Sequence, residues 1–248
     1  MPIIREYRSC GLRKYVLPSC LLAASMSILA TAARAQQQDV PRFDAFGGYA
    51  FLNSPHVSLF ENGFAAQIGF RPRRWLSFGL DYTRASGTLN LTADLLLPSL
   101  QQSLGAQLGQ LAAAHMLPAG YTLKVPAHSV TQTFAVGPQL AYRGMTHSTL
   151  FLRPLFMGLI HEAATPKPED AIATAIVKQL SPDGVKKDNV LFFGFGGGFD
   201  ILFSRHFAWR TQADLVYDHL FNDLLKDGRF TVRFASGPAF NFGKNVEK

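Results

Sequence analysis

The sequence predicts an all-β fold: an eight-stranded antiparallel up-and-down transmembrane β-barrel with helical insertions in extracellular loops 2 and 3. Three observations support this prediction. Eight segments alternate apolar and polar residues, the connections between them are by turns short and long, and the N-terminus has the pattern of an export signal. Segments of about 10–15 residues cross a bilayer as strands tilted by about 45°.

The N-terminus reads as a secretory signal peptide. A basic stretch precedes a mostly apolar stretch at 16–29, and Ala33-Arg34-Ala35 offers a small-x-small cleavage site. An N-terminal membrane anchor is the alternative, but the apolar stretch is short and Pro18 interrupts it. We therefore expect a signal peptide at 1–35 and a single outer-membrane β-barrel domain at 36–248. The basic residues are Arg5, Arg8, Arg13 and Lys14.

Removal of this signal changes the charge and the cysteine content. The chain has 24 Lys+Arg and 17 Asp+Glu, and residues 36–248 keep 19 and 16 of them, so the net charge falls from +7 to +3. This weak basicity gives no reason to expect nucleic acid as a partner. Cys10 and Cys20 both precede residue 36, so we expect no disulfide in the exported chain.

Period-two alternation locates the strands. It is clearest at 75–84, where every second residue is apolar, and ambiguous at 149–161, where both faces are apolar except at Arg153. The segments 88–91 and 121–125 also alternate, which leaves ten strands as an alternative. The eight expected strands are 42–53, 62–71, 75–84, 130–142, 149–161, 189–203, 207–219 and 229–242.

The orientation of the two faces separates a membrane barrel from a soluble one. A soluble calyx would keep its apolar face inside, and a β-sandwich would bury it between two sheets. Here the polar face carries both signs of charge in near balance, which suits a narrow lumen because buried charges persist when paired. The expected lumen charge network is Asp44, Arg71, Asp81, Arg153, Asp200, Arg210, Asp214 and Arg233.

Amphipathic aromatic residues mark the expected membrane interfaces. Trp75 and Trp209 follow short turns, Tyr142 precedes one, and Tyr82 and Tyr217 lie near the opposite ends of their strands. From Trp75 to Tyr82 the strand rises roughly 18 Å at about 3.3 Å per residue and about 40° tilt. We therefore predict two interfacial girdles with the short turns on the periplasmic side.

The export signal, the eight strands and the final segment Gly237-Pro238-Ala239-Phe240-Asn241-Phe242-Gly243-Lys244 together resemble the OmpA-like small outer-membrane β-barrel proteins. The resemblance covers about 42–244. It implies the outer membrane of a Gram-negative bacterium, with outer-membrane lipid and the barrel-assembly machinery as partners. Two departures are expected: no periplasmic domain after the barrel, and a terminal aromatic, Phe242, that is not the last residue.

Two long loops contain apolar residues at helical spacing. Leu100, Leu104, Leu108 and Leu111 recur in loop 2, and Ile172, Ile176 and Leu180 recur in loop 3. We hypothesise that the two helices pack together as a cap, with Gly105 and Gly109 allowing close approach. The alternatives are a stripe on the outer leaflet, a surface partner that docks on loops 2 and 3, and a mobile solvated loop.

No catalytic, cofactor or metal site is expected. His128-Ser129 are neighbours in a strand and point to opposite faces, so they cannot act as a dyad. The sequence favours a non-enzymatic barrel with a structural or surface-interaction role. A small porin-like diffusion channel is the alternative, and a membrane-embedded hydrolase using Asp214, Asp218, His219 and Asp223 is a weaker one.

Overall fold

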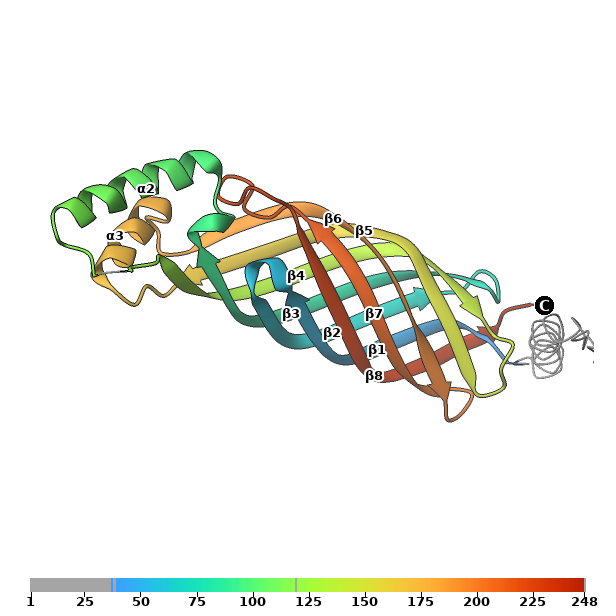
Figure 1. The fold of residues 1–248 in the computed structure, drawn as a ribbon. Coiled ribbons are helices and arrows are strands. Elements are labelled where there is room, and N and C mark those ends of the chain that lie inside the picture. Colours follow the sequence, from blue (N-terminus) through green and yellow to red (C-terminus); the bar gives the residue numbers. More distant parts are fainter. Residues whose placement is uncertain (1–36, 38, 119, 248) are drawn as a thin grey trace, which may run out of the picture.

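The chain forms one antiparallel sheet that closes on itself (Figure 1). A computed structural model describes residues 37, 39–118 and 120–247, so the expected signal peptide lies outside the described residues. Each strand pairs with its neighbours in chain order and β1 pairs with β8, which confirms the eight-stranded barrel. The strands are β1 (Pro41–Ser54), β2 (Leu59–Phe70), β3 (Leu76–Thr92), β4 (Lys124–Tyr142), β5 (Ser148–Pro166), β6 (Lys186–Leu202), β7 (Phe207–Asp218) and β8 (Arg229–Asn245).

Several strands are longer at the long-loop end than the sequence pattern suggested. Residues 88–91 continue β3, and Leu91 pairs with Val125 of β4 rather than forming an additional hairpin. The expected strands at 42–53 and 62–71 leave a long connection at 54–61, and this was wrong, since only η2 (Pro55–Val57) and Ser58 separate β1 from β2. Leu59 pairs with Ser54 and both are buried, so inward packing extends the strands into this segment.

The outer face of the barrel is apolar and the inner face is largely polar. Leu80 and Phe193 keep 65% and 54% of their surface exposed, whereas Asp81 and Arg210 are 6% and 0% exposed. In a single sheet open to solvent, this pattern would place hydrophobic side chains in water. It is the pattern of a barrel whose outer face lies in lipid.

Strand β5 contains a β-bulge that accounts for its ambiguous sequence pattern. Arg153 pairs with Gly196 and Phe156 pairs with Gly194, so β5 has one residue more than β6 across this stretch. Arg153 and Phe156 are consequently both buried, although they are three positions apart. Pro154 lies in the bulge, and bulges are among the places in a sheet where proline, which has no N–H to donate, is tolerated.

Two helices lie beyond the long-loop end of the barrel, opposite the C-terminus (Figure 1). They are α2 (Pro98–Ala113), which follows η3 (Ala93–Leu95), and α3 (Ala171–Leu180). One apolar cluster joins them, and Leu111 is half-buried outside it. Its buried members are Leu96, Leu104, Leu123, Val125, Ala173 and Ile176, with Leu91, Leu100, Leu108, Tyr121, Ile172, Val177 and Leu180 packed against them.

The glycines of α2 take no part in this packing. A Cβ placed on Gly105 or Gly109 would meet no atom within 4 Å, so both residues lie on the open side of the helix. Close approach through a G-x-x-x-G face was therefore a wrong expectation, and leucine side chains make the contact instead. Within the described stretches of the chain, no helix is long and apolar enough to cross a membrane.

Candidate functional site: the lumen and its mouth

The lumen contains three levels of ion-paired side chains, and the level nearest the short turns is electrically balanced. Arg210 Nε and Nη2 donate to the two carboxylate oxygens of Asp200 at 2.8 and 2.9 Å. Asp44 lies 3.1 Å from Arg71 and 2.9 Å from Arg210, so it joins the two guanidinium groups. We call Asp44, Arg71, Asp200 and Arg210 the inner level.

Glycine on the polar face leaves room for this level. A Cβ on Gly69 would lie 2.1 Å from Asp44 Oδ1, far inside van der Waals contact. Gly69 pairs directly with Asp44 across β1 and β2, so the missing side chain lets the carboxylate lie flat between the strands. The small residues on the inner face therefore position the charges in this narrow barrel.

The middle level repeats the arrangement with two further aspartates and two arginines. Arg153 contacts both Asp81 and Asp214, with Nη1 3.1 Å from Asp214 Oδ2. Arg233 donates to the same Asp214 oxygen at 2.7 Å. Asp81, Arg153, Asp214 and Arg233 are all at most 6% exposed, and this level is also neutral.

Inward-facing phenylalanines fill the space between these levels. Arg153 lies over the Phe156 ring at 4.1 Å, and Arg210 lies 5.1 Å from the Phe151 ring. Such cation–π contacts stabilise a desolvated guanidinium. These rings were not predicted from the sequence, although Gly194 and Gly198 opposite them were a usable signal. A Cβ on Gly198 would lie 2.8 Å from the Phe151 ring.

A third level lies where the strands leave the apolar band. We call Glu61, Glu162, Asp218 and Arg229 the outer level. Arg229 pairs with Glu162 and, at 2.9 Å, with Asp218, while Ser129 donates to Glu162 at 2.9 Å. This level was not predicted from the sequence, because the predicted strands end near these positions. Most outward-facing residues beside it are polar, namely Asn62, Arg84, Gln132, His161 and Asn189, while Phe60 and Phe230 are exposed next to Glu61 and Arg229. The level therefore lies at the outer rim of the apolar band.

Glu61 is the exceptional member of the outer level. It is fully buried, and neither of its carboxylate oxygens has a hydrogen-bond partner among the described residues. Burial, together with the nearby Glu162 carboxylate, raises the pKa of Glu61 to about 7. Three carboxylates share one arginine at this level, so protonation of Glu61 relieves an excess of negative charge.

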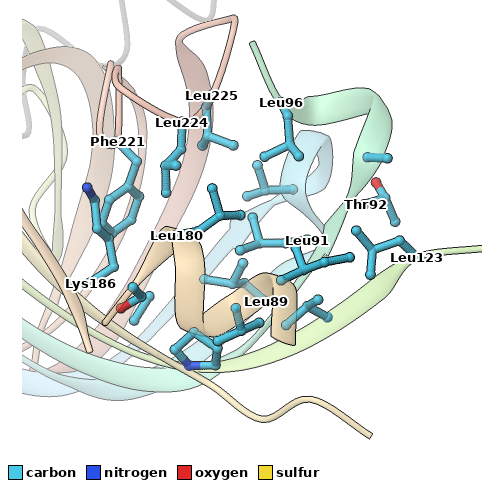
Figure 2. A pocket seen from close by; sticks show the side chains of 18 of the residues that line it. Leu89, Leu91, Thr92, Leu96, Leu123, Leu180, Lys186, Phe221, Leu224 and Leu225 are labelled. Atoms are coloured by element: carbon cyan, nitrogen blue, oxygen red, sulfur yellow. The ribbon is translucent and has the colours of Figure 1, made fainter. Parts of the chain in front are cut away.

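Above the outer level, the mouth of the barrel contains an apolar hollow of about 70 Å³. Of its twenty lining residues, fifteen are apolar, and Glu162 and Arg229 form its charged floor. Figure 2 shows Leu89 and Leu91 of β3, Leu180 of α3, and Phe221 of the last long loop around this space. The hollow thus combines walls from strands, a helix and a loop that are distant in sequence.

A network of polar contacts lies at the opposite end of the lumen, near the first described residue. The Gln37 side chain donates to Ser148 O and Thr149 Oγ1, each at 3.0 Å, and it is buried. Arg143 Nη1 donates to Thr149 Oγ1 at 3.0 Å and its Nε donates to Arg74 O at 2.9 Å. This network spans the short-turn end.

The aromatic residues expected at the interfaces lie on the outer surface. Trp75, Tyr142 and Trp209, at the short-turn end, are 56%, 49% and 42% exposed. Tyr82 and Tyr217 are half-buried because they pack against neighbouring rings, with centroids 4.8 Å from Phe134 and 4.9 Å from Phe230. All five are thus placed to contact lipid or its interface.

The acidic and histidine residues suggested for a hydrolase do not form one group. Asp214 belongs to the middle level and Asp218 to the outer level. Asp223, in the last long loop, pairs with Lys186 of β6. His219 is exposed on the surface. Within the described residues, no three His, Cys, Asp or Glu side chains are arranged to hold a metal ion.

The closed ring, the apolar outer face and the charged lumen define the class of small eight-stranded outer-membrane β-barrels. No protein-family model and no curated protein matches the chain. Among solved structures, it is similar to the outer membrane protein OprG from Pseudomonas aeruginosa at 9% identity, covering 84% of this chain and 99% of that one, with a TM-score of 0.50.

Two further solved structures are similar with lower scores. Neisserial surface protein A is 11% identical, with 81% of this chain and 96% of that one covered and a TM-score of 0.45. Ail, the attachment invasion locus protein of Yersinia pestis, is 12% identical, with 82% and 99% covered and a TM-score of 0.45. The closed eight-stranded topology and the similarity to OprG confirm the resemblance to OmpA-like small barrels at the level of the fold.

Proposed function

We propose that this protein is a non-enzymatic barrel of the Gram-negative outer membrane whose lumen is sealed and whose extracellular loops form an interaction site. The observation that carries the proposal is the stack of buried ion pairs, since the inner and middle levels each cross the lumen with two arginines and two aspartates. The interior of an eight-stranded barrel is just wide enough for side chains to fill it.

Passage of a solute would require breaking these levels. Removing one partner of a buried ion pair costs about 3–5 kcal/mol, because a buried charge is left without compensation. Arg153 and Asp214 share contacts within the middle level, so opening a path would disturb several pairs together. This cost favours a sealed barrel over the small diffusion channel that the sequence also allowed.

The apolar outer face, the barrel fold and the long loops each suggest a partner. Outer-membrane lipid covers the apolar face, and the barrel-assembly machinery inserts the chain. A surface partner would meet loops 2 and 3, where α2 and α3 lie at the long-loop end of the barrel (Figure 1). We assign no role in nucleic-acid binding, because the net charge of residues 36–248 is only +3.

Planar-bilayer recording tests the sealed lumen. We expect the refolded protein to give no stepwise conductance, while a general porin in the same bilayer does. Heat-modifiable gel migration of the same sample establishes that the barrel has closed before recording. Stepwise openings from a sample with full heat-modifiability would contradict the proposal and return the diffusion channel as the better reading.

A further inference from the structure

The hollow at the mouth is a partly enclosed apolar site with walls from strands, a helix and a loop. Leu89, Val125 and Ala164 come from three strands, Ile176 and Leu180 from α3, and Phe221 from the last long loop. Leu89, Ala164 and Ile176 are each at most 5% exposed. An enclosed apolar lining with few polar groups is typical of small-molecule sites.

Ser181 supplies a polar group in this lining without an internal partner. It follows the last residue of α3 and is 8% exposed. Its Oγ is buried and has no hydrogen-bond partner in the part of the chain that the structure describes. A buried hydroxyl left unpaired costs free energy, and a ligand that hydrogen-bonds with it recovers that cost.

The charged groups of the hollow are already compensated. Glu162 pairs with Arg229 on the floor, and Lys186 pairs with Asp223 at the rim. A charged ligand would therefore be desolvated in an apolar space without a free counter-charge. A neutral molecule avoids this cost.

We propose that the hollow binds a small neutral apolar molecule that carries a single hydroxyl, with Ser181 as the hydrogen-bonding residue. The volume of about 70 Å³ is several times the roughly 10–15 Å³ that one water needs, which suits a single-ring phenol or a short alcohol. The inference rests on the proposed function, because it assigns a ligand class to the same extracellular loops.

Methyl NMR of the protein in lipid nanodiscs tests the site with 4-fluorophenol as the probe. We expect saturable shifts of the Leu89, Ile176 and Leu180 methyl groups. The lipid-facing Leu80 and Leu152 report partitioning into the bilayer, so their methyl groups should shift only in proportion to probe concentration. Shifts confined to Leu80 and Leu152 would overturn the proposal.

Two comparisons test the hydrogen bond to Ser181 and the preference for a neutral ligand. Ser181→Ala should weaken binding of 4-fluorophenol by roughly five- to tenfold, as expected for loss of one hydrogen bond. The same variant should leave fluorobenzene, which lacks the hydroxyl, unaffected. Equal losses for both probes, or tighter binding of 4-fluorobenzoate than of 4-fluorophenol, would overturn the assignment.

A cavity-filling pair provides a second test. Ala164→Leu adds volume inside the hollow and should abolish saturable binding, whereas Ala66→Leu makes the same change on the lipid face and should not. Heat-modifiable migration verifies that both variants fold, and if Ala164→Leu does not fold, the Ser181→Ala comparison still decides. Conductance tests the sealed lumen independently of ligand binding. A barrel that conducts no ions and shows no saturable binding would contradict the ligand site and leave the proposed function intact.

Discussion

At the scale of single residues, Arg153 joins the two aspartates of the middle level, as Arg233 does on their other side. It contacts Asp81 and Asp214 and lies over the Phe156 ring. We predict that Arg153→Met lowers the free energy of unfolding by about 3–5 kcal/mol, because two buried aspartates are left with Arg233 as their one remaining cation in this level. Arg84→Met, at an exposed arginine of the same barrel, should change it by at most about 0.5 kcal/mol. Urea unfolding in liposomes measures both, and equal effects would contradict the assignment.

Glu61 makes stability depend on pH in an unusual direction. Its pKa is raised to about 7 in the folded protein from an ordinary value of 4.5, so between these values the folded state holds a proton that the unfolded state has lost. Stability contributed by this group is therefore present below about pH 4.5 and is lost as pH rises through 7. The shift in the pKa of Glu61 corresponds to a decrease in the free energy of unfolding on the order of 3 kcal/mol.

Replacement of this carboxylate by its neutral isostere tests the prediction. Glu61→Gln should remove the decrease in the free energy of unfolding at high pH. The variant should therefore be more stable than the wild type at pH 8 and differ little from it at pH 5. Urea unfolding at both pH values measures it. Asp183→Asn, at an exposed loop residue, serves as the control. A Glu61→Gln variant that is destabilised equally at both pH values would show that the carboxylate is charged throughout.

At the scale of elements, α3 is held by a narrow apolar stripe. Ile176 is 5% exposed within the cluster that joins α2 and α3, whereas its neighbour Ala175 is exposed. Burying an isoleucine side chain contributes about 1.5–3 kcal/mol, and 1.4 kcal/mol is a tenfold change in an equilibrium. We predict that Ile176→Asp speeds tryptic cleavage after Lys178 at least tenfold, while Ala175→Asp does not. Equal cleavage of the two variants would show that α3 is not docked.

The strands and loop helices were predictable from the sequence to different degrees. Alternation placed all eight strands because each side chain faces either lipid or the lumen, and the two environments select opposite residue types. The bulge at Pro154 could not be placed, since both faces of that segment are apolar. The helical spacing in loops 2 and 3 indicated helices, but their contact face depends on tertiary packing, which Gly105 and Gly109 illustrate.

The features of the site that sequence reasoning missed depend on the dimensions of the whole molecule. Glu162 pairs with Arg229, and Glu61 lies near both, because β2, β5 and β8 continue to the outer rim of the barrel. The ends of strands are poorly marked in sequence. The residues that line the hollow are scattered along the chain between Val57 and Arg229, so no local sequence pattern connects them. The inner and middle levels lie within regular alternation, which is why their members could be named beforehand.

At the scale of the whole molecule, the height of the apolar band determines which bilayers suit the barrel. Between Trp75 and Tyr82 the band measures roughly 18 Å at about 3.3 Å per residue and about 40° tilt, less than the typical 25 Å. Mismatch costs fractions of a kcal/mol per Å. We predict faster and more complete folding in bilayers of ten- to twelve-carbon lipids than in those of eighteen-carbon lipids.

A change to the outer edge of this band should shift the preference. Arg84 and Gln132 pair directly across β3 and β4 and face outward just beyond Tyr82 and Phe134. The double substitution Arg84→Leu with Gln132→Leu extends the apolar surface by two residues, or roughly 5 Å at the same rise and tilt. Folding yield should then peak in a thicker bilayer, while Arg84→Lys with Gln132→Asn should keep the original optimum. An optimum that is the same for all three proteins would mean that this polar edge does not set the membrane boundary.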